Sequence, residues 1–184
     1  MDTEPTAGAS GGGQATLNLL PGTTYFADNP AFFSRTPTGS GTTTDMSSLS
    51  GSTGSIFTAD TGSSYFSVTW VGYFYAPTTG NYYFTTYSDD ASYLWIGTNA
   101  KTGYTTANAN VKNGSLHGGV SVISSAISLT GGTLYPIRVQ YGQNAGGYDF
   151  SMSFSGPGIS TTSNFSGYVF TSLDTTAYPT IGRS

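Results

Sequence analysis

Hydrophobic and polar residues alternate with a period of two along several segments in the second half of the chain. The clearest apolar face belongs to residues 66–75 and consists of Phe66, Val68, Trp70, Gly72 and Phe74. Residues 148–154 repeat the pattern, with Tyr148 and every second residue after it apolar. Since a β-strand places alternate side chains on opposite faces, both segments are predicted to be strands with one buried face.

Further short strands are predicted at residues 81–87, at 92–97 and on both sides of a turn at Gly131–Gly132. The segment Pro77–Gly80 is typical of a turn, so the strands before and after it are expected to form a hairpin. No segment has a sustained helical period. The pattern therefore predicts an all-β fold, an antiparallel, jelly-roll-like β-sandwich with long surface loops.

The 184 residues suit a single domain with its own core. Residues 1–14 are low in complexity and are predicted to be a flexible N-terminal tail or linker, while residues 15–184 are predicted to form one β-sandwich domain. Residues 36–64 are rich in Ser, Thr and Gly. This composition predicts long surface loops with one short strand at Ser55–Thr58.

The low charge of the chain narrows the classes of function. Charged residues make up 8% of the sequence, against about 25% in an average soluble domain, and five basic residues leave a net charge of −4. Because there is no cluster of lysine and arginine in the sequence, no nucleic acid partner is predicted. No apolar run approaches the ~20 residues of a membrane span. The absence of cysteine excludes disulfides and thiolate metal sites.

Two features resemble catalytic motifs but do not predict catalysis. Gly8–Gly12 has the G-x-S-x-G spacing of serine hydrolases, yet that motif requires a sharp strand-to-helix turn, and here it lies in the glycine-rich tail. The single histidine, His117, lies in a polar loop, where it is expected to line a ligand groove. The protein is therefore predicted not to be an enzyme.

Two adjacent carboxylates, Asp89 and Asp90, follow directly on an aromatic strand pattern. Glycosidases hold two carboxyl groups about 5–9.5 Å apart on either side of a sugar. Two residues adjacent in sequence are poorly placed for this geometry. A solvent-exposed turn at residues 88–91 is one explanation that stays open. A metal site is the other, because strand residues resume shortly after the pair and place it at the rim of the sandwich.

A calcium site would use both carboxylates together. Calcium takes about 6–8 oxygen ligands from carboxylates, amides, backbone carbonyls and water, and both aspartates could reach one ion if the peptide bond between them were cis. Residues 141–149 are the candidate second loop, since Gln143 and Asn144 carry amide oxygens and glycines follow them. An ordinary glycine-rich hairpin is the alternative for this loop.

Three segments together resemble one family. They are WVGYFYAPTTGNYYFTTYSDDASYLWIG (residues 70–97), LYPIRVQYGQNAGGYDFSMSFSGPG (134–158) and NFSGYVF (164–170). Their order and spacing are similar to the β-sandwich lectin domain shared by anthrax protective antigen, yeast flocculins, GLEYA-type fungal adhesins and bacterial surface adhesins. The double aspartate after a strand and YPIR before a glycine-containing loop are the most specific similarities. The region before Ser64 has no comparable match.

The resemblance implies a calcium-binding role for the paired aspartates. In the sugar-binding branch of the family they form a cis-peptide motif that binds one calcium ion, and a later loop adds an amide oxygen and backbone carbonyls. Applied to this sequence, the resemblance implies that Asp89 and Asp90 are the paired calcium ligands and that Gln143 or Asn144 supplies the amide oxygen. The second loop looks shorter than in flocculins, and the disulfide-rich part of flocculins has no counterpart here, so the resemblance does not transfer a sugar preference.

The sequence thus predicts a calcium-dependent carbohydrate-binding (lectin) domain of a cell-surface adhesin. Its calcium ion would coordinate vicinal hydroxyls of a terminal sugar, and Tyr148, His117 and Trp95 are nominated for the sugar-binding rim, with Trp95 nearer the core. The expected partners are cell-surface glycans, and the expected setting is a monomeric extracellular module within a larger surface protein. A structural or protein-interaction sandwich and an accessory carbohydrate-binding module of a glycoside hydrolase are the alternatives.

Overall fold

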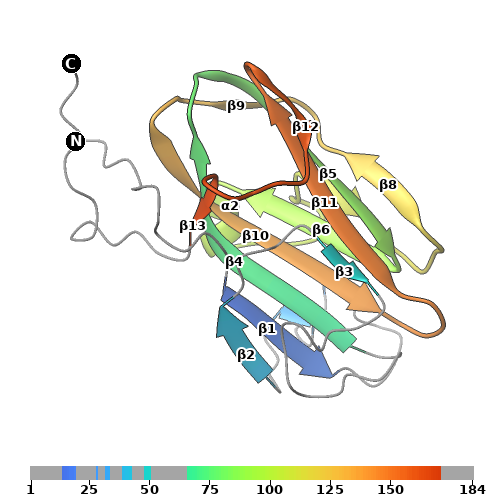
Figure 1. Ribbon diagram of the computed structural model, residues 1–184. Helices are drawn as coiled ribbons and strands as arrows, with labels where there is room; N and C mark the ends of the chain where they lie inside the picture. Colours follow the sequence, from blue (N-terminus) through green and yellow to red (C-terminus); the bar gives the residue numbers. More distant parts are fainter. Residues whose placement is uncertain are drawn as a thin grey trace.

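The computed structural model describes residues 14–19, 28, 32–33, 39–42, 48–50 and 66–170, with side chains for 28, 32–33 and 66–170. The rest of the predicted tail and the strand expected at Ser55–Thr58 lie outside the described residues. In the described parts, strands dominate and form two antiparallel sheets that face each other (Figure 1).

The first sheet has seven strands in the described part of the chain, with the order β2-β1-β4-β10-β6-β7 and with β13 paired to β4. Its strands are β1 (Gln14–Leu19), β2 (Gly39–Thr42), β4 (Phe66–Ala76), β6 (Ala91–Ile96), β7 (Val111–Asn113), β10 (Thr133–Gln143) and β13 (Val169–Phe170). β4 and β10 pair over their full lengths and form the centre of this sheet.

The second sheet has six strands among the described residues, with the order β12-β11-β5-β8, with β3 paired to β11 and with β9 paired to β5. Its strands are β3 (Ser48–Ser50), β5 (Gly80–Asp89), β8 (Val120–Ile123), β9 (Ile127–Leu129), β11 (Asp149–Gly156) and β12 (Ile159–Thr162). The short helix α2 (Thr98–Lys101) follows β6. A helix with the length and apolar character to span a membrane is not found among the described residues.

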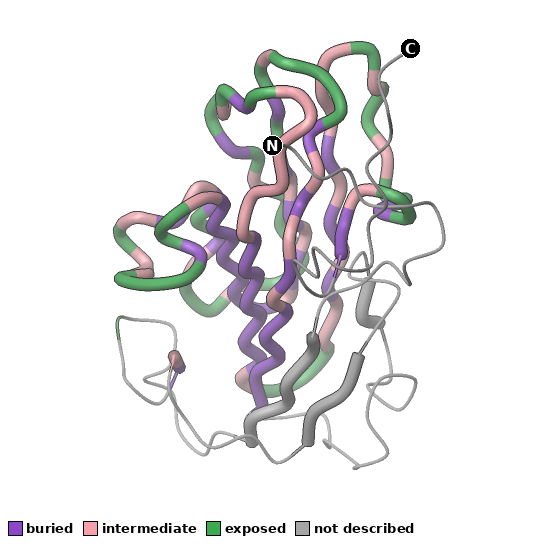
Figure 2. The backbone as a smooth tube through the Cα atoms, turned by 90° about the vertical axis from the view of Figure 1, so that its left-hand side faces the viewer, coloured by how far each residue is buried: buried purple, intermediate pink, exposed green. Residues whose placement is uncertain are grey.

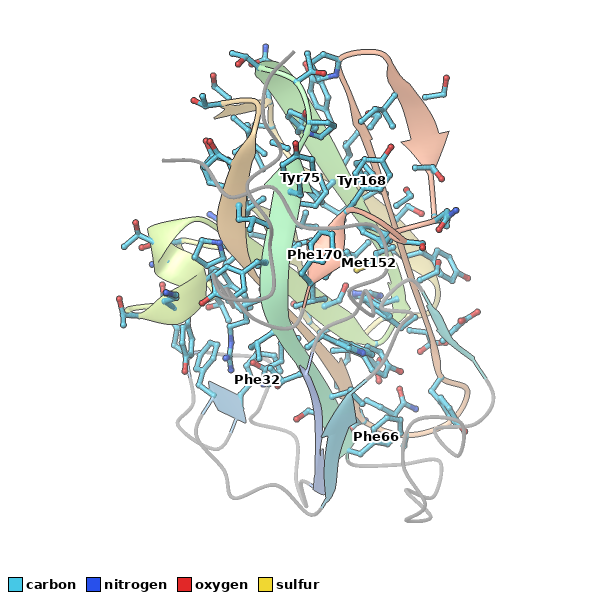
Figure 3. All side chains as sticks on the ribbon, turned by 60° about the vertical axis from the view of Figure 1, so that its left-hand side comes forward. Phe32, Phe66, Tyr75, Met152, Tyr168 and Phe170 are labelled. Carbon is cyan, nitrogen blue, oxygen red and sulfur yellow. The ribbon has the colours of Figure 1, made fainter. Side chains whose placement is uncertain are left out.

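The predicted alternation is confirmed in the core between the two sheets. Residues 150, 152 and 154 of β11 are buried, whereas the residues between them are only partly buried. Trp70 of β4 stacks on Phe150 of β11 across the sandwich, with ring centroids 4.9 Å apart. Met152 lies in the same interior, labelled in Figure 3, and Figure 2 shows the buried residues along the central strands and the exposed ones in the loops. The predicted antiparallel β-sandwich is therefore the observed fold.

The predicted hairpin between residues 66–75 and 81–87 is wrong. β4 pairs with β1, β10 and β13, while β5 pairs with β11, β8 and β9, so the chain crosses from one sheet to the other at residues 77–79. The reason is packing across the sandwich. The Phe74 ring lies edge-on against Phe84 at 5.0 Å, a contact that joins opposing sheets and that a hairpin would not make.

A second aromatic cluster covers the outer face of the first sheet. All six residues of β6 are buried, because Leu94 and Ile96 face the sandwich core while Tyr93 and Trp95 face this second cluster. The cluster also includes Phe32, whose carbonyl accepts a hydrogen bond from Gln140 Nε2 of β10. A strand buried on both faces has no polar face, which explains the continuous apolar run of β6.

Candidate functional site

Two crossovers between the sheets meet at one end of the sandwich. The first runs from β5 to β6 through Asp89 and Asp90, and the second runs from β10 to β11 through residues 144–148. In Figure 1 the arrowheads of β5 and β10 lie together at the lower right. Asn144 N donates a hydrogen bond of 2.9 Å to Asp90 Oδ2, so the two crossovers are in direct contact.

Asp90 is held by loops on both sides of its carboxylate. Its side chain is only 6% exposed, and His117 N donates to Oδ1 at 3.0 Å while Asn144 N donates to Oδ2. The peptide bond between Asp89 and Asp90 is cis. Because Asp90 is buried and the segment crosses between sheets, the alternative of a hairpin turn with both carboxylates in water does not hold.

Asp89 lies beside the glycines of the second crossover. It pairs with Asp149 across β5 and β11, and a Cβ atom placed on Gly147 would lie 3.7 Å from Asp89 Oδ2. Burial raises the pKa of the Asp89 carboxyl above its usual range, Asp90 and Asp149 raise it further, and His117 opposes them. No lysine or arginine among the described residues contributes to that shift, so His117 is the one basic side chain that opposes it.

Tyr141 fixes the backbone of the aspartate pair from β10. Its hydroxyl donates to the carbonyl of Asp89 and lies 3.3 Å from Gln143 Oε1, a second acceptor for the same proton. Burial, followed by the charges of Asp90 and Asp89, raises the pKa of the Tyr141 phenol. The hydroxyl therefore stays protonated and remains a donor.

The two amide side chains predicted for the site have different environments. Gln143 is fully buried, and its Nε2 donates to the carbonyls of Gly147 at 2.9 Å and Gly146 at 3.5 Å, which shapes the second crossover. Asn144 Oδ1 is also buried, but it has no hydrogen-bond partner. A buried carbonyl oxygen without a donor is costly, so Asn144 Oδ1 is the amide oxygen suited to a cation.

A buried cluster of polar side chains supports the first crossover, and it was not among the features predicted from the sequence. Ser92 Oγ donates to Thr86 Oγ1 and shares a hydrogen bond with Ser88 Oγ, each at 2.8 Å. Asn113 Nδ2 donates to Ser88 Oγ at 3.0 Å and to the carbonyl of Val120 at 2.8 Å. The available signal was the presence of Thr and Ser at inward positions of β5 and β6, where a core would otherwise be apolar.

The three residues nominated for the rim lie in three different places. His117 lies beside Asp90 through its backbone, and its ring Nδ1 is 2.7 Å from the carbonyl of Gly118. Tyr148 is half-buried and packs edge-on against Phe66, with ring centroids 5.4 Å apart. Trp95 is fully buried in the second aromatic cluster, where its Nε1 donates to the carbonyl of Thr105 at 2.9 Å. The structure therefore does not bring Trp95 to the rim.

The donor set of the site suits a hard cation. No group of three or more His, Cys, Asp and Glu side chains with metal-binding geometry occurs within the described ranges. The oxygens gathered here are instead the carboxylates of Asp89 and Asp90, the amide oxygen of Asn144 and the carbonyls of a glycine-rich crossover. Such a mixture of carboxylate, amide and carbonyl oxygens fits calcium better than zinc or copper.

The raised pKa of the Asp89 carboxyl predicts that the Asp89→Asn substitution stabilises the metal-free protein. A carboxyl whose pKa is higher in the folded than in the unfolded chain favours folding at low pH, and this contribution is lost as the pH rises through the folded pKa. In EDTA at about pH 7 we expect the melting temperature of the variant to exceed that of the parent by roughly 1–4 °C. Calorimetry at several pH values tests this, and a variant that melts lower than the parent would contradict it.

Comparison with known proteins places the central part of the chain in one family. The GLEYA domain family matches residues 66–156, which begin with β4, end with β11 and include both crossovers. No curated protein matches the sequence.

Solved structures share the fold at low sequence identity. The A domain of Epithelial Adhesin 9 from Candida glabrata, in complex with Galβ1-4GlcNAc, has a TM-score of 0.63 and 18% identity, with 92% of this chain and 94% of that chain covered. The PA14 sugar-binding domain from an RTX adhesin has a TM-score of 0.61 and 14% identity, with coverage of 87% and 94%.

A bacterial protein of another kind shares the fold as well. An anti-sigma factor domain-containing protein from Clostridium clariflavum has a TM-score of 0.64 and 18% identity, with 92% of this chain covered. The present chain spans about half of that protein, 51% of its length. At these sequence identities, each of the three similarities shows a shared fold only. In the Clostridium clariflavum protein, the sandwich accounts for about half of the chain.

Proposed function

Because this chain belongs to the GLEYA domain family over residues 66–156, we propose that it is a calcium-dependent carbohydrate-binding domain of a cell-surface adhesin. The observation that carries the proposal is the contact of Asp90 with Asn144 where two crossovers touch, at a residue whose buried Oδ1 has no hydrogen-bond partner. The role is binding without catalysis, in an extracellular module of a larger surface protein.

The residues of the site divide into ligands and supports. Asp89, Asp90 and Asn144 would hold the ion, while Gln143 and Tyr141 keep the two crossovers in place through their hydrogen bonds. A bound calcium ion supplies open coordination positions that two neighbouring sugar hydroxyls can fill. The adjacent negative charges of Asp89 and Asp90, which no described lysine or arginine offsets, favour a cation at this point before any sugar arrives.

Sugar specificity would come from the loops around these ligands. His117 brings its loop against Asp90, and Tyr148 stands on the second crossover, so both are candidates for sugar contacts. Epithelial Adhesin 9 is solved with galactose-containing disaccharides, which makes these the first glycans to test here. A single shallow contact of this kind binds weakly, so adhesion would depend on many copies on one surface.

Calcium titration by calorimetry, followed by a glycan array with calcium and with EDTA, tests the proposal. We expect one calcium ion per chain and glycan signals that disappear in EDTA. Calcium binding without any glycan would favour a structural or protein-interaction module. Glycan binding that persists in EDTA would contradict calcium dependence but keep the lectin function, and binding of polysaccharide chains alone would favour an accessory module of a glycoside hydrolase.

The environments of the two amides predict that Asn144→Ala weakens calcium binding. The variant removes Oδ1 but keeps the backbone hydrogen bond to Asp90, so we expect a calcium Kd higher by at least about tenfold with little change in the melting temperature of the metal-free protein. Asn81→Ala is the matched control, since Asn81 is exposed near the start of β5. Equal calcium affinities for both variants would remove Asn144 from the ligand set.

A further inference from the structure

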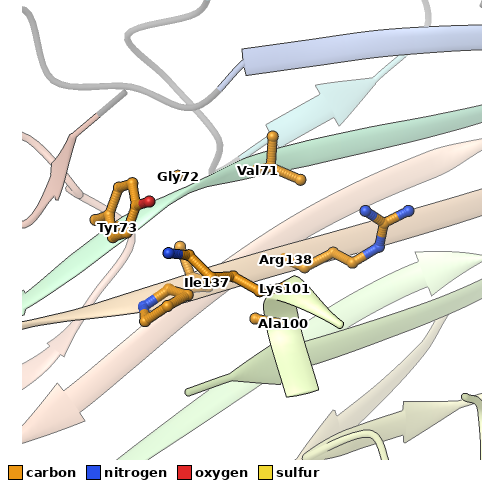
Figure 4. A pocket seen from close by; sticks show the side chains of 8 residues that line it. Val71, Gly72, Tyr73, Ala100, Lys101, Ile137 and Arg138 are labelled. Carbon is orange, nitrogen blue, oxygen red and sulfur yellow. The ribbon is translucent and has the colours of Figure 1, made fainter. Parts of the chain in front are cut away.

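A cavity of about 250 Å³ opens on the outer face of the first sheet. Val71 and Tyr73 of β4, Ala100 and Lys101 of α2, and Pro136 and Arg138 of β10 line it (Figure 4). Val71 and Tyr73 alternate with the core residues of β4, so their side chains face away from the sandwich interior. The wall thus combines apolar side chains with two basic ones.

The positive charge of this cavity is unusual for the chain. Lys101 and Arg138 are two of only five basic residues in a protein with a net charge of −4, and none of the described residues that line the cavity is acidic. Figure 4 shows the Lys101 ammonium beside Tyr73 at one end and the Arg138 guanidinium at the other. Charges of one sign against low-dielectric walls concentrate the potential inside a cleft and attract ions of the opposite sign.

Arg138 is buried, and no carboxylate of the described residues pairs with it. It is 9% exposed, its Nε has no hydrogen-bond partner, and its Nη2 donates only a long bond of 3.3 Å to Gln140 Oε1. Its guanidinium lies 3.9 Å from the centroid of the Tyr104 ring, which supports one face of the plane but satisfies no N–H. Buried cations are normally paired, because an uncompensated one is costly.

We propose that this cavity binds a small organic carboxylate. The carboxylate group would pair with the guanidinium of Arg138, since the planar guanidinium matches a carboxylate in geometry and charge. The body of the ligand would lie on the apolar wall around Tyr73 and Pro136, and its size is limited by the volume of the cavity. Lys101 is exposed and acts mainly by raising the local potential.

This site is separate from the aspartate pair. Arg138 precedes Gln143 by five positions on β10, which corresponds to about 17 Å along the strand, and the two side chains project to opposite faces. The proposal therefore does not depend on the calcium-dependent function. A chain with both sites would bind a cation at one end of β10 and an organic anion near the middle of the same strand.

The test follows the Arg138 Nε–H signal in ¹⁵N-labelled protein during titration with sodium glucuronate and with sodium isovalerate. Glucose is the neutral control, and sodium chloride controls for ionic strength. We expect a saturable shift that chloride and glucose do not produce. A shift with glucuronate assigns the site to acidic sugars, and a shift with isovalerate alone assigns it to aliphatic acids. The absence of a saturable shift with either acid overturns the proposal.

Variants separate a specific site from general charge attraction. Arg138→Gln should weaken binding by at least about tenfold, followed through the shifts of neighbouring backbone amides. If that variant does not fold, Lys101→Gln remains informative. We expect its affinity for the acid to fall by roughly two- to fivefold at low salt, and the loss to fade as salt is added. Lys112→Gln on the exposed face of β7 is the charge-matched control and should bind normally. An equal loss in the Lys101 and Lys112 variants overturns the proposal.

Discussion

Asp90→Asn is expected to abolish calcium binding, with a loss of affinity of at least about 100-fold, and to abolish calcium-dependent glycan binding with it. The carboxylate accepts hydrogen bonds on both oxygens, from His117 N and from Asn144 N. An amide keeps one acceptor and turns an N–H₂ group towards the other donor, so the variant loses a charge and separates the two crossovers. Calorimetry with calcium measures the first loss, and a glycan array measures the second.

Asp28→Asn is the control for this experiment. It removes the same charge from an exposed side chain whose carboxylate accepts hydrogen bonds from Thr106, remote in sequence from both crossovers. We expect calcium affinity in this variant within about threefold of the parent, because exposed charges are largely screened. Circular dichroism and melting curves in EDTA confirm that both variants are folded. Calcium binding by Asp90→Asn at parental affinity would contradict the assignment of the site.

Phe74→Ala is expected to have the largest effect on stability, about 3–5 kcal/mol in the free energy of unfolding. Phe74 is fully buried, and its ring contacts Tyr82, Phe84, Phe154 and Tyr168 at centroid distances of 5.0–6.4 Å. Phe74 belongs to the first sheet, whereas these rings come from the second sheet and from the segment before β13. Truncation would therefore leave a cavity at a point where the two layers are joined, which few neighbouring side chains can fill by small shifts.

Urea unfolding followed by tryptophan fluorescence measures this loss. Tyr83→Ala is the matched control, since Tyr83 is a neighbouring aromatic residue on the outer face of β5 and is 37% exposed. We expect less than about 1 kcal/mol for the control. Similar losses in the two variants would mean that Phe74 does not connect the sheets in the way the ring contacts indicate.

The candidate site was predictable from sequence in its local parts. Asp89 and Asp90 are neighbours, and the second loop is a short segment with recognisable amides, so each half could be named separately. The choice between Gln143 and Asn144 could not be made, because it depends on which amide finds a donor after the crossovers dock. Trp95 could not be placed either, since a tryptophan in a strand suits a rim and a buried cluster equally.

The fold was predictable to the level of strands and buried faces, but not to the level of strand neighbours. The period-two pattern of β4 and β5 is the same in a hairpin and in a crossover between sheets, because in both cases one face of each strand is buried. The short turn between them favoured a hairpin, and packing of Phe74 against the opposite sheet decided otherwise.

The sequence by itself determined the all-β class, the buried face of each long strand and the identity of the paired aspartates, since each depends on residues close together in the chain. The tertiary structure alone decided the contact of Asp90 with Asn144, which are 54 positions apart, and the placement of Lys101 and Arg138 in the wall of one cavity. Local pattern selects the face that a strand buries. Long-range packing selects what that strand, and each loop at its end, will touch.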